Sequence, residues 1–491
     1  MKTDARFRVS ILKLVLASAV LALTCRAAGA QTAPAVACES LAGRELADVR
    51  ITSAAEVAAA NGNPSHCKVL GTQNGTEHDI EALLPDSWSG RLYQQGGGGF
   101  DGQIREPLSP AHAAAPGSIA LASGAIVLAN NGGYRDPTGA ELSNNPAATQ
   151  LYMHTAILAV KKFGNALAIV YFGAAPKYSY YVGCSNGGRG AANAASRYGG
   201  EYDGVISGAP GLNNGGVVEG WIQAAALDLP DAEKLKAVNA AAMAKCDALD
   251  GAKDGVISNW EACKFDPTVD APAAGLTASQ ARSVKALMTD LKLKDGTTIY
   301  SGLGFGDMSP WARGYAMLGM EFTRNLILND SKWTPTGFDV DTNYHVINDV
   351  LRAKGFNPEP EGIVAFLQRG KKMIVWQGSD DTLASHRDTI RVFQGILKTA
   401  GPQAAANSRL YIASGVNHCG GGPGADDFDL LTPLMRWVEK GEAPAKVIAS
   451  KLDQPGGKTL FTRPMCTYPN FPKYKGAGDI NDAANFACAA K

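Results

Sequence analysis

The sequence predicts an α/β fold, with a doubly wound and mostly parallel sheet into which a large lid domain is inserted. Short apolar runs typical of buried strands alternate with helical stretches up to residue 211 and again from residue 362. One such run leads through a G-x-S-x-G pentapeptide directly into a helical stretch. Between residues 212 and 361 this alternation is lost. We therefore expect two core segments, 31–211 and 362–491, with the lid formed by 212–361.

Residues 1–30 are typical of a secretory signal peptide. Basic residues are followed by an apolar run at 11–23 and by Ala28-Gly29-Ala30, after which we expect cleavage. The apolar run is too short for a transmembrane helix, and no later stretch resembles one. We expect a secreted or periplasmic protein without a membrane span. Its 46 basic and 46 acidic residues form no basic stripe, which argues against a nucleic-acid partner.

Eight cysteines remain after the leader is removed. An even number in an exported chain favours disulfides over free thiols or zinc ligands. The sequence alone does not determine their connectivity. Cys184 and Cys419 are far apart in the chain, whereas the other six have neighbours, which suggests the pairs Cys38–Cys67, Cys246–Cys263 and Cys466–Cys488. Cys184 is then left to pair with Cys419.

The first core segment begins with an extension at 38–70, tied by a disulfide. Its strand-like runs then end in a glycine-rich loop. Four glycines at 96–99, followed by Phe100-Asp101-Gly102, come directly after one of these runs. Such a loop lets backbone amides approach a ligand without intervening side chains. Strands are expected at 78–84, 91–95, 125–129 and 204–207, and a crossover helix is expected at 146–163.

The strand expected at 178–182 runs into Gly183-Cys184-Ser185-Asn186-Gly187, and a helix of small residues follows. Strand, G-x-S-x-G and helix in this order form the nucleophile elbow of an α/β-hydrolase. The tight turn exposes Ser185 Oγ, and the Asn186 amide points to where an oxyanion would form. In this fold a glycine-rich loop donates the second oxyanion amide. We assign that amide to Gly98, with Gly99 as the alternative.

A nucleophilic serine needs a base and an orienting carboxylate, which α/β-hydrolases supply in the chain order serine, acid, histidine. The strand expected at 372–377 ends near Asp380 and Asp381, and the strand expected at 409–413 is followed by His418. His386 is the rival base, but it starts a helix beside the acid and could not reach Ser185 from there. Helices at 387–399 and 427–440 and a loop-rich tail complete this segment.

A disulfide between Cys184 and Cys419 would have a direct consequence for this site. Cys184 immediately precedes Ser185, and Cys419 immediately follows His418. A disulfide holds its two Cα atoms within about 7 Å of each other. The bond would therefore clamp the elbow to the histidine loop and position base and nucleophile in advance.

The lid combines helical stretches at 224–243 and 277–291 with a carboxylate-rich loop between Cys246 and Cys263. With Asp250 as position 1, Asp254 is position 5 and Glu261 is position 12, much as in an EF-hand loop. Position 3 is Ala252, which offers only its carbonyl. Oxygen donors at this density suit calcium rather than zinc. An acidic surface turn closed by a disulfide would explain the same pattern.

Cys184-Ser185, Asp381 and His418-Cys419 resemble the cysteine-flanked catalytic motif of the tannase and feruloyl esterase family. Residues 96–102 and 208–213 (Gly-Ala-Pro-Gly-Leu-Asn) are also similar to blocks of that family. The resemblance covers nearly the whole mature chain. Thr382 replaces the proline that usually follows the acid. The family's acid segment is matched here by Gly378, Asp381, Ser385 and Asp388-Thr389, which favours Asp381 over Asp380.

The resemblance implies a calcium ion that holds the lid, and no cofactor for the chemistry. We expect the lid also to form the acyl pocket, where Trp311 could stack on an aromatic ring and Arg313 could bind a carboxylate or phenol. Ordinary lid packing and a surface charge are the alternative explanation of these two residues, and the sequence favours that explanation. By the resemblance, the calcium ligands would be the side chains of Asp247, Asp250 and Asp254 and the carbonyls of Ala252 and Val256.

We therefore expect a serine esterase that acts on a small-molecule ester of an aromatic acid through Ser185, His418 and Asp381. Feruloyl and other hydroxycinnamoyl esters come first among the substrates. The alternatives within the family are a tannase, which cleaves galloyl esters, and a hydrolase of mono(2-hydroxyethyl) terephthalate. A non-catalytic binding module is the alternative from another class, and the presence of all three triad residues argues against it. The oligomeric state does not follow from the sequence.

Overall fold

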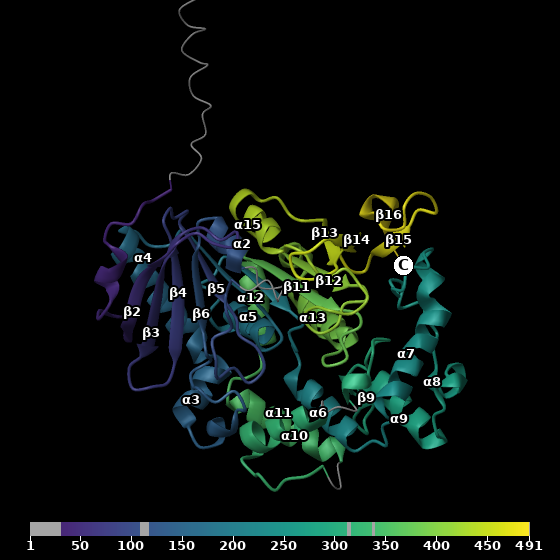
Figure 1. Cartoon of the computed structure of the whole chain (residues 1–491). Helices are drawn as coiled ribbons and strands as arrows, with labels where there is room; N and C mark the ends of the chain where they lie inside the picture. Colours follow the sequence, from purple (N-terminus) through teal and green to yellow (C-terminus); the bar gives the residue numbers. More distant parts are fainter. Residues whose placement is uncertain (1–30, 109–116, 312–315, 336–338, 491) are drawn as a thin grey trace, which may run out of the picture.

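The computed structural model describes residues 31–108, 117–311, 316–335 and 339–490 (Figure 1). The predicted signal peptide, residues 1–30, lies outside them. The core is a ten-stranded sheet with the order β1-β2-β3-β4-β6-β5-β7-β8-β11-β12. Its strands are β1 (Glu45–Leu46), β2 (Val49–Val57), β3 (His66–Gln73), β4 (Asp79–Pro85), β5 (Arg91–Gln95), β6 (Ile126–Asn130), β7 (Tyr178–Cys184), β8 (Gly204–Gly208), β11 (Lys372–Gly378) and β12 (Ser408–Ala413).

The sheet changes character along its width. Strands β1 to β4 pair antiparallel, and β4 is also antiparallel to β6. From β6 to β12 all neighbouring strands are parallel. Strands β6 and β8 are buried at every position, as expected for parallel strands covered on both faces. The predicted α/β class is confirmed, and the parallel arrangement brings the carboxyl ends of β5, β7, β11 and β12 to one edge.

Helices cover both faces of this sheet. Alternate residues of a strand point to opposite faces, so Tyr180 packs with Leu434 on one face and Tyr181 packs with Phe366 on the other. The first face is covered by α2 (Gly117–Ala122) and α15 (Leu431–Lys440). The second is covered by α4 (Ala156–Phe172), α5 (Asn186–Arg197), α12 (Pro360–Gln368), α13 (His386–Ala400) and α14 (Pro402–Ala405).

The crossover helix before β7 is longer and less regular than the predicted 146–163. It consists of α3 (Pro146–Gln150), a π-helical segment η3 (Leu151–Thr155) and α4. Gly164 does not end it, because Gly164 faces the sheet, where a Cβ would lie 2.4 Å from Leu128 Cδ1. Within the described residues, Pro146–Phe172 is long and apolar enough to cross a membrane, but 56% of its most apolar window is buried, as in a core helix.

The lid lies between β8 and α12, at the bottom of Figure 1. The predicted helix at 224–243 is two helices, because Pro230 interrupts it and the Asp231 side chain caps the second by accepting the Lys234 N–H. The predicted 277–291 helix is shorter, with Thr277 as its N-cap. The lid elements are α6 (Asn214–Ala225), α7 (Ala232–Cys246), α8 (Pro267–Asp270), α9 (Ala278–Met288), α10 (Ala316–Phe322), α11 (Val340–Ala353), β9 (Leu291–Lys292) and β10 (Thr298–Tyr300).

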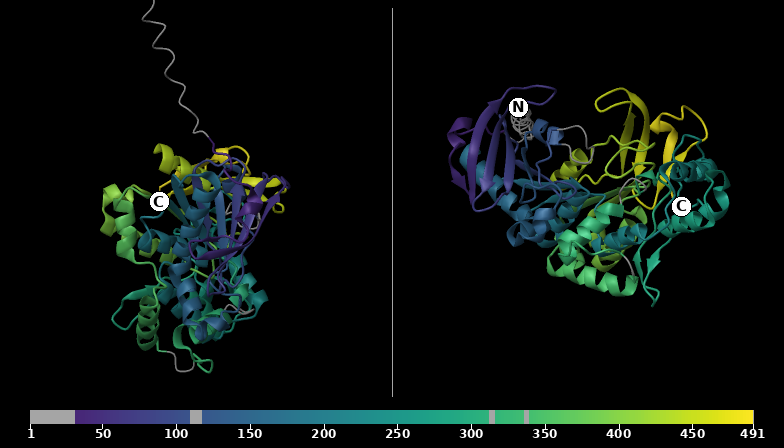
Figure 2. Two further views of the ribbon diagram at one scale, coloured as in Figure 1. Left: turned by 90° about the vertical axis from the view of Figure 1, so that its left-hand side faces the viewer. Right: turned by 60° about the horizontal axis from the view of Figure 1, so that its bottom comes forward.

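The tail, which was predicted to be loop-rich, forms two small antiparallel sheets. These are β13 (Lys446–Leu452) with β14 (Thr459–Cys466), and β15 (Phe471–Tyr474) with β16 (Phe486–Ala489). Val447, Ala449 and Met465 of the first hairpin pack into the main core, which explains why an ordered hairpin forms there. Figure 2 shows the tail and the N-terminal strands at opposite ends of the molecule.

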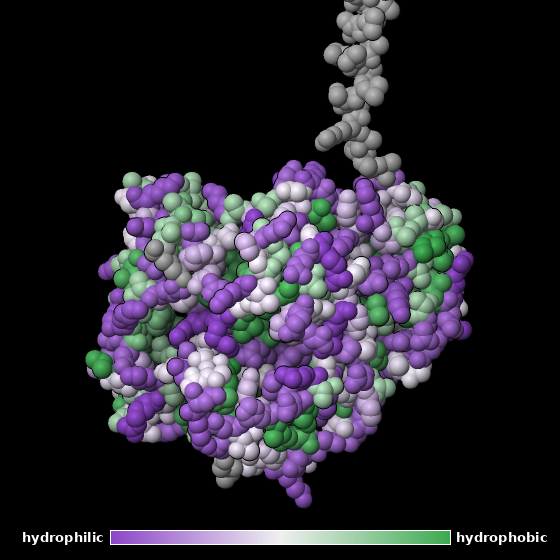
Figure 3. Space-filling view, turned by 180° about the vertical axis from the view of Figure 1, so that it is seen from behind, coloured by the Kyte–Doolittle hydropathy of each residue, from purple (hydrophilic) through white to green (hydrophobic). Residues whose placement is uncertain are grey.

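Hydrophobic side chains are scattered among hydrophilic ones on the face seen in Figure 3. Such scattering is ordinary for a folded surface. Among the described residues, the exposed large hydrophobic side chains come from the core, the lid and the tail: Ile169, Leu249, Val269, Leu318, Val346, Ile448 and Leu460.

Candidate active site

Ser185 lies in the turn between β7 and α5. Its φ of 60° and ψ of −125° are strained for a residue with a side chain. A Cβ at Gly187 would lie 2.5 Å from the Gly97 carbonyl oxygen, so glycine lets the elbow pack directly against the glycine-rich loop. Asn186 is the first residue of α5, and the N–H groups of a helix N-terminus are suited to bind an anion.

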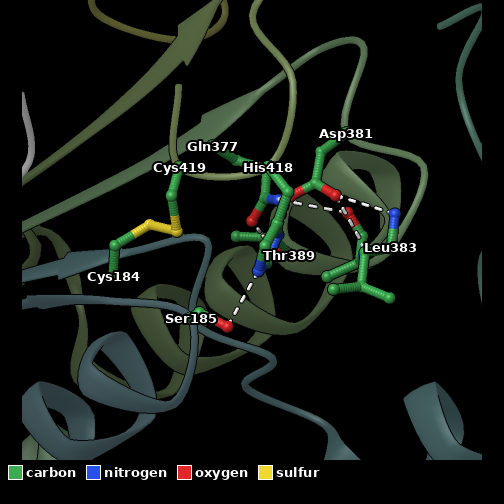
Figure 4. Close-up of a disulfide and its surroundings, with 9 residues drawn as sticks. Cys184, Ser185, Gln377, Asp381, Leu383, Thr389, His418 and Cys419 are labelled. Carbon is green, nitrogen blue, oxygen red and sulfur yellow. Dashed lines mark hydrogen bonds and ion pairs between the residues drawn. A yellow bond between two sulfur atoms is a disulfide. The ribbon is translucent and has the colours of Figure 1, made fainter. Parts of the chain in front are cut away.

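His418 lies between Ser185 and Asp381 (Figure 4). His418 Nε2 is 2.8 Å from Ser185 Oγ, and its Nδ1 is 2.7 Å from Asp381 Oδ2. Asp381 is fully buried, and its Oδ1 accepts the N–H groups of Leu383 and Ala384, each at 2.9 Å. Gln377 Nε2 donates to Asp381 Oδ2 as well. The carboxylate is therefore held rigidly in a position from which it orients the imidazole.

The neighbouring Asp380 and the rival His386 occupy other positions. Asp380 accepts a hydrogen bond from Ser379 Oγ at 2.9 Å, and burial raises the pKa of its carboxyl to about 6. His386 is buried at the start of α13, where its ring packs edge-on against Trp260. Of the two adjacent aspartates, Asp381 is the one that contacts His418, as the family resemblance had implied.

A disulfide joins Cys184 to Cys419, with 5.9 Å between the two Cα atoms (Figure 4). It connects the end of β7 to the loop that carries His418. Because the bond is adjacent to both Ser185 and His418, it restrains the distance between nucleophile and base. The other three expected pairs, Cys38–Cys67, Cys246–Cys263 and Cys466–Cys488, are also disulfide-bonded.

The glycine-rich loop differs from the prediction in one respect. The Gly98 N–H donates to the Asp101 carboxylate, which lowers the pKa of that carboxyl, although burial is the larger effect and raises it to about 6. Gly99, with a φ of +61°, lines the pocket beside Ser185. The Gly98 N–H therefore already has an acceptor, which favours Gly99, the alternative predicted from the sequence, as the candidate oxyanion donor.

An apolar pocket of about 130 Å³ opens beside Ser185 and His418. An apolar cavity of about 150 Å³ holds benzene, so this pocket has room for one aromatic ring. Asn214 adds an amide whose buried Nδ2 has no hydrogen-bond partner in the described part of the chain. The walls come from both core and lid, with Phe100, Tyr152, Val217, Val218, Trp221, Leu318, Phe322, Phe356 and Leu383 among the lining residues.

Of the two residues predicted to bind substrate, the structure describes only Trp311. Trp311 is buried in the lid core with Leu303 and Met308, and its Nε1 donates to the Thr382 carbonyl at 3.0 Å. The pocket is not lined by Trp311. Arg313 lies outside the described residues. Trp311 was a candidate for stacking on the substrate because a pocket for an aromatic acid needs flat apolar walls, whereas its ring fills the lid interior.

The aromatic residues that do line the pocket were not identified from the sequence. Tyr152 comes from the π-helical segment before α4, Phe322 from the end of α10, and Phe356 from the connection between α11 and α12. Trp221 of α6 also lines the pocket, and its Nε1 donates to the Leu383 carbonyl at 2.8 Å. No local pattern distinguishes these residues from core aromatics, because the pocket forms only where the segments meet.

The predicted metal loop is a tight turn closed by Cys246–Cys263. Asp250 is fully buried, and its Oδ2 lacks a hydrogen-bond partner among the residues that the structure describes. Burial, with smaller effects from Asp254 and Asp247, raises the pKa of Asp250 to about 6. A buried, unpartnered carboxylate oxygen near two further carboxylates fits a site for a divalent cation.

Two observations limit this fit. Asp254 forms an ion pair with Arg463 of β14, at 2.6 Å. Among the described residues, Cys38, Glu56 and Cys67 form the one group of three potential side-chain ligands with donor atoms within 4.8 Å of one another. Both of those cysteines are disulfide-bonded, so that group is no metal site. The loop aspartates, which the structure describes, do not bring three donor atoms within that distance.

Comparison with known proteins places this geometry in context. The family model described as tannase and feruloyl esterase matches residues 67–353 and 358–489. The mono(2-hydroxyethyl) terephthalate hydrolase of Piscinibacter sakaiensis is 31% identical over 89% of this chain and 87% of that protein. A probable feruloyl esterase of Arthroderma benhamiae is 30% identical over 83% of this chain and 81% of that protein.

Solved structures with the same fold include an esterase from Aspergillus oryzae, with a TM-score of 0.81, 21% identity and coverage of 92% of this chain and 100% of that one. The tannin acyl hydrolase from Aspergillus niger has a TM-score of 0.73, 18% identity and coverage of 90% and 92%. At these identities the similarity concerns the fold.

Proposed function

The chain belongs to the tannase and feruloyl esterase family and is a carboxylic ester hydrolase, and from this premise we propose that it is an exported serine esterase for esters of aromatic acids. The proposal is carried by one observation. Ser185, His418 and Asp381 form a continuous hydrogen-bonded chain that a disulfide clamps beside an aromatic-lined pocket.

In the proposed reaction Ser185 Oγ attacks the ester carbonyl carbon while His418 Nε2 takes the serine proton. Asp381 holds the imidazole in the required tautomer and stabilises its positive charge. The oxyanion of the tetrahedral intermediate accepts the N–H groups of Asn186 and Gly99. His418 then protonates the departing alcohol oxygen, leaving the acyl group on Ser185, and the same residues guide water to release the acid.

The acyl pocket supports an aromatic acid as the group that is transferred to Ser185. Its volume suits one ring, and its aromatic walls would pack against both faces of that ring. The buried amide of Asn214 would bind an oxygen substituent on the ring. Feruloyl and other hydroxycinnamoyl esters are the first choice on these grounds. Galloyl esters and mono(2-hydroxyethyl) terephthalate are the alternatives. Relatives named as a feruloyl esterase and as a mono(2-hydroxyethyl) terephthalate hydrolase match the chain.

A substrate panel tests this proposal. Hydrolysis of methyl ferulate, methyl gallate, mono(2-hydroxyethyl) terephthalate and a short aliphatic ester is followed under the same conditions. We expect the highest kcat/KM for methyl ferulate. Cleavage of the aliphatic ester with no turnover of the three aromatic esters would show that the aromatic assignment is wrong.

A fluorophosphonate probe distinguishes the enzyme from a binding module on the same fold. We expect a covalent adduct at Ser185, located by peptide mapping, because the probe reacts with a serine that a neighbouring base activates. Heat-unfolded protein is the control and should not react. Absence of the adduct in folded protein would favour the binding module.

We also propose that calcium binds in the lid loop. The ion would be held by the carboxylates of Asp247, Asp250 and Asp254 and the carbonyls of Ala252 and Val256, and it would stabilise the lid rather than act on the ester. Support comes from the unpartnered oxygen of Asp250 and from the density of oxygen donors.

Export is the remaining part of the proposal. Four disulfides in one chain are typical of an oxidising compartment. Together with the signal-like leader, they support a secreted or periplasmic protein whose mature chain begins at Gln31. N-terminal sequencing of the protein recovered from its native compartment checks the cleavage site.

A further inference from the structure

The reaction described above uses the backbone N–H of Asn186, yet the side chain of this residue is held at both ends. Asn186 Nδ2 donates to Asp101 Oδ1 at 3.0 Å, and Asn186 Oδ1 accepts from Arg189 Nε at 2.7 Å. Both partners are charged, which makes these hydrogen bonds stronger than those between neutral groups. The first residue of α5 is therefore fixed in orientation by its side chain as well as by the elbow.

Asp101 connects this residue to the other half of the oxyanion site. It follows the glycine-rich loop, and it also accepts the Gly98 N–H. Glycines make the space for its carboxylate, since a Cβ at Gly97 or Gly132 would lie 2.8 or 2.6 Å from an Asp101 carboxylate oxygen. One carboxylate thus contacts both segments that carry the proposed oxyanion amides, the elbow and the glycine-rich loop.

Arg189 anchors the other end of this arrangement. Its guanidinium is buried and donates to the carbonyls of Tyr152, Met153 and Phe356, at 2.9, 2.5 and 3.2 Å. Tyr152 and Met153 lie in the π-helical segment η3. In this segment, where the regular i→i+4 pattern is interrupted, two successive carbonyls accept from the Arg189 guanidinium. The Phe356 ring also lies against the guanidinium, with 3.9 Å between the ring centroid and Arg189 Cζ.

We propose that Asp101, the Asn186 side chain and the buried Arg189 form a clamp that fixes the two oxyanion amides relative to each other. Asp101 and Arg189 are positioning residues, since they act through Asn186 and the glycine-rich loop. The role of the clamp rests on the proposed ester hydrolysis. Its consequence is that the oxyanion site needs no rearrangement when the charge develops, which is the condition under which such sites are most effective.

A double-mutant cycle tests the clamp. Asp101→Asn keeps the shape of the side chain. Its NH₂ group, however, would face one of the two donors that the carboxylate accepts, Asn186 Nδ2 or the Gly98 N–H. Asn186→Ala keeps the backbone N–H and removes the side chain that the clamp holds. We expect each variant to lose about 10²-fold in kcat with KM changed less than about threefold, because the lost interaction matters in the transition state. The double variant should lose no more than either single variant.

A transition-state analogue separates this role from a general loss of structure. Affinity for an arylboronic acid, which forms a tetrahedral adduct with the serine, should fall in parallel with kcat/KM. Asp203→Asn is the matched control. Asp203 is also a half-buried carboxylate paired with a cation, Lys371, but it lies at the opposite end of β7, and we expect kcat and KM to stay within about twofold.

Two results would overturn the clamp. The first is multiplicative loss in the double variant, which would mean that Asp101 and Asn186 act independently. The second is a loss confined to KM with unchanged boronate affinity. The cycle is measured with whichever ester the wild-type protein cleaves fastest, so a failed aromatic assignment leaves its outcome readable. Thermal unfolding of each variant is measured in parallel, and kinetics are compared well below the lowest transition.

Discussion

At the scale of single residues, Asp380 and Asp381 show how little separates the proposed catalytic carboxylate from a neighbour of the same type. Both carboxylates are buried, but they point to different partners, Ser379 in one case and His418 in the other. Only the family resemblance favoured Asp381, because composition and spacing fit either residue. The direction of a side chain at the end of a strand is decided by the loop that follows it.

This difference can be tested directly. Asp381→Asn should reduce kcat by about 10⁴-fold while leaving the fold intact, because the amide stabilises the wrong imidazole tautomer. Asp380→Asn is the matched control and should change kcat by less than about tenfold, since it lacks a contact with the histidine. Steady-state hydrolysis of a chromogenic ester measures both. Equal losses in the two variants would contradict the assignment.

Glu219 of α6 gives a second prediction at this scale. It is fully buried in the lid, and neither carboxylate oxygen has a partner among the described residues. Burial raises its pKa from 4.5 to about 8. Between pH 4.5 and about 8, the folded state therefore keeps a proton that the unfolded chain loses. The stability associated with the protonated Glu219 is fully present below pH 4.5 and is lost as the pH rises to about 8.

Glu219→Gln removes this titration. We expect the variant and the wild-type protein to differ little near pH 5, and the variant to be relatively more stable at pH 9 by a few kcal/mol, about 1.4 kcal/mol for each pH unit between the two pKa values. Urea unfolding at pH 5, 7 and 9 measures the difference. Groups that titrate in both proteins cancel. Parallel stability curves over this range would show that Glu219 is not held neutral.

At the scale of elements, the site depends on strands that end at one edge. The sequence placed β5, β7, β11 and β12 to within about two residues, because short apolar runs bounded by glycine are a strong local signal. Helix ends were less well predicted. Pro230 divides α6 from α7, and η3 interrupts the crossover helix, since side-chain caps and distant donors such as Arg189 decide where a helix continues.

The disulfide between the elbow and the histidine loop supplies the prediction at this scale. Removing it with Cys184→Ala and Cys419→Ala should lower kcat by about 10- to 100-fold, because the base is then free to move by an ångström or so from the nucleophile. Removing Cys466–Cys488 in the same way is the control. Both double variants should lose about 2–5 kcal/mol of stability, but the control should retain its kcat. Unchanged kcat in the Cys184→Ala/Cys419→Ala variant would show that the Cys184–Cys419 disulfide is not needed to position the base.

At the scale of the whole molecule, the lid is tied to the tail as well as to the core. Asp254 of the carboxylate-rich loop pairs with Arg463 of β14, and Glu261 accepts a hydrogen bond from the Tyr468 hydroxyl at 3.1 Å. In Figure 1 the lid helix α7 lies next to the tail strands β15 and β16. An ion in this loop would therefore stabilise the contact between lid, tail and core together.

Calcium removal tests this arrangement. We expect chelation to lower the Tm by about 3–8 °C relative to protein in saturating calcium, since ligand binding at 100 times Kd adds about 2.7 kcal/mol. Asp250→Asn should abolish the calcium-dependent part of the Tm. Identical Tm values with calcium and with chelator would contradict a calcium site. Differential scanning calorimetry gives this readout independently of activity.

By itself the sequence indicated the elbow, the order of the proposed catalytic residues and the α/β class, because each depends on a short run of residues with a strong local preference. It also suggested all four disulfides, since three pairs are close in the chain and the fourth was what remained. The tertiary structure decided which aromatic residues line the pocket, that the Gly98 N–H donates to Asp101, and that Asn186 links Asp101 to Arg189. Those contacts join segments that are distant in the chain, and burial and hydrogen bonding between such segments leave no pattern within any one of them.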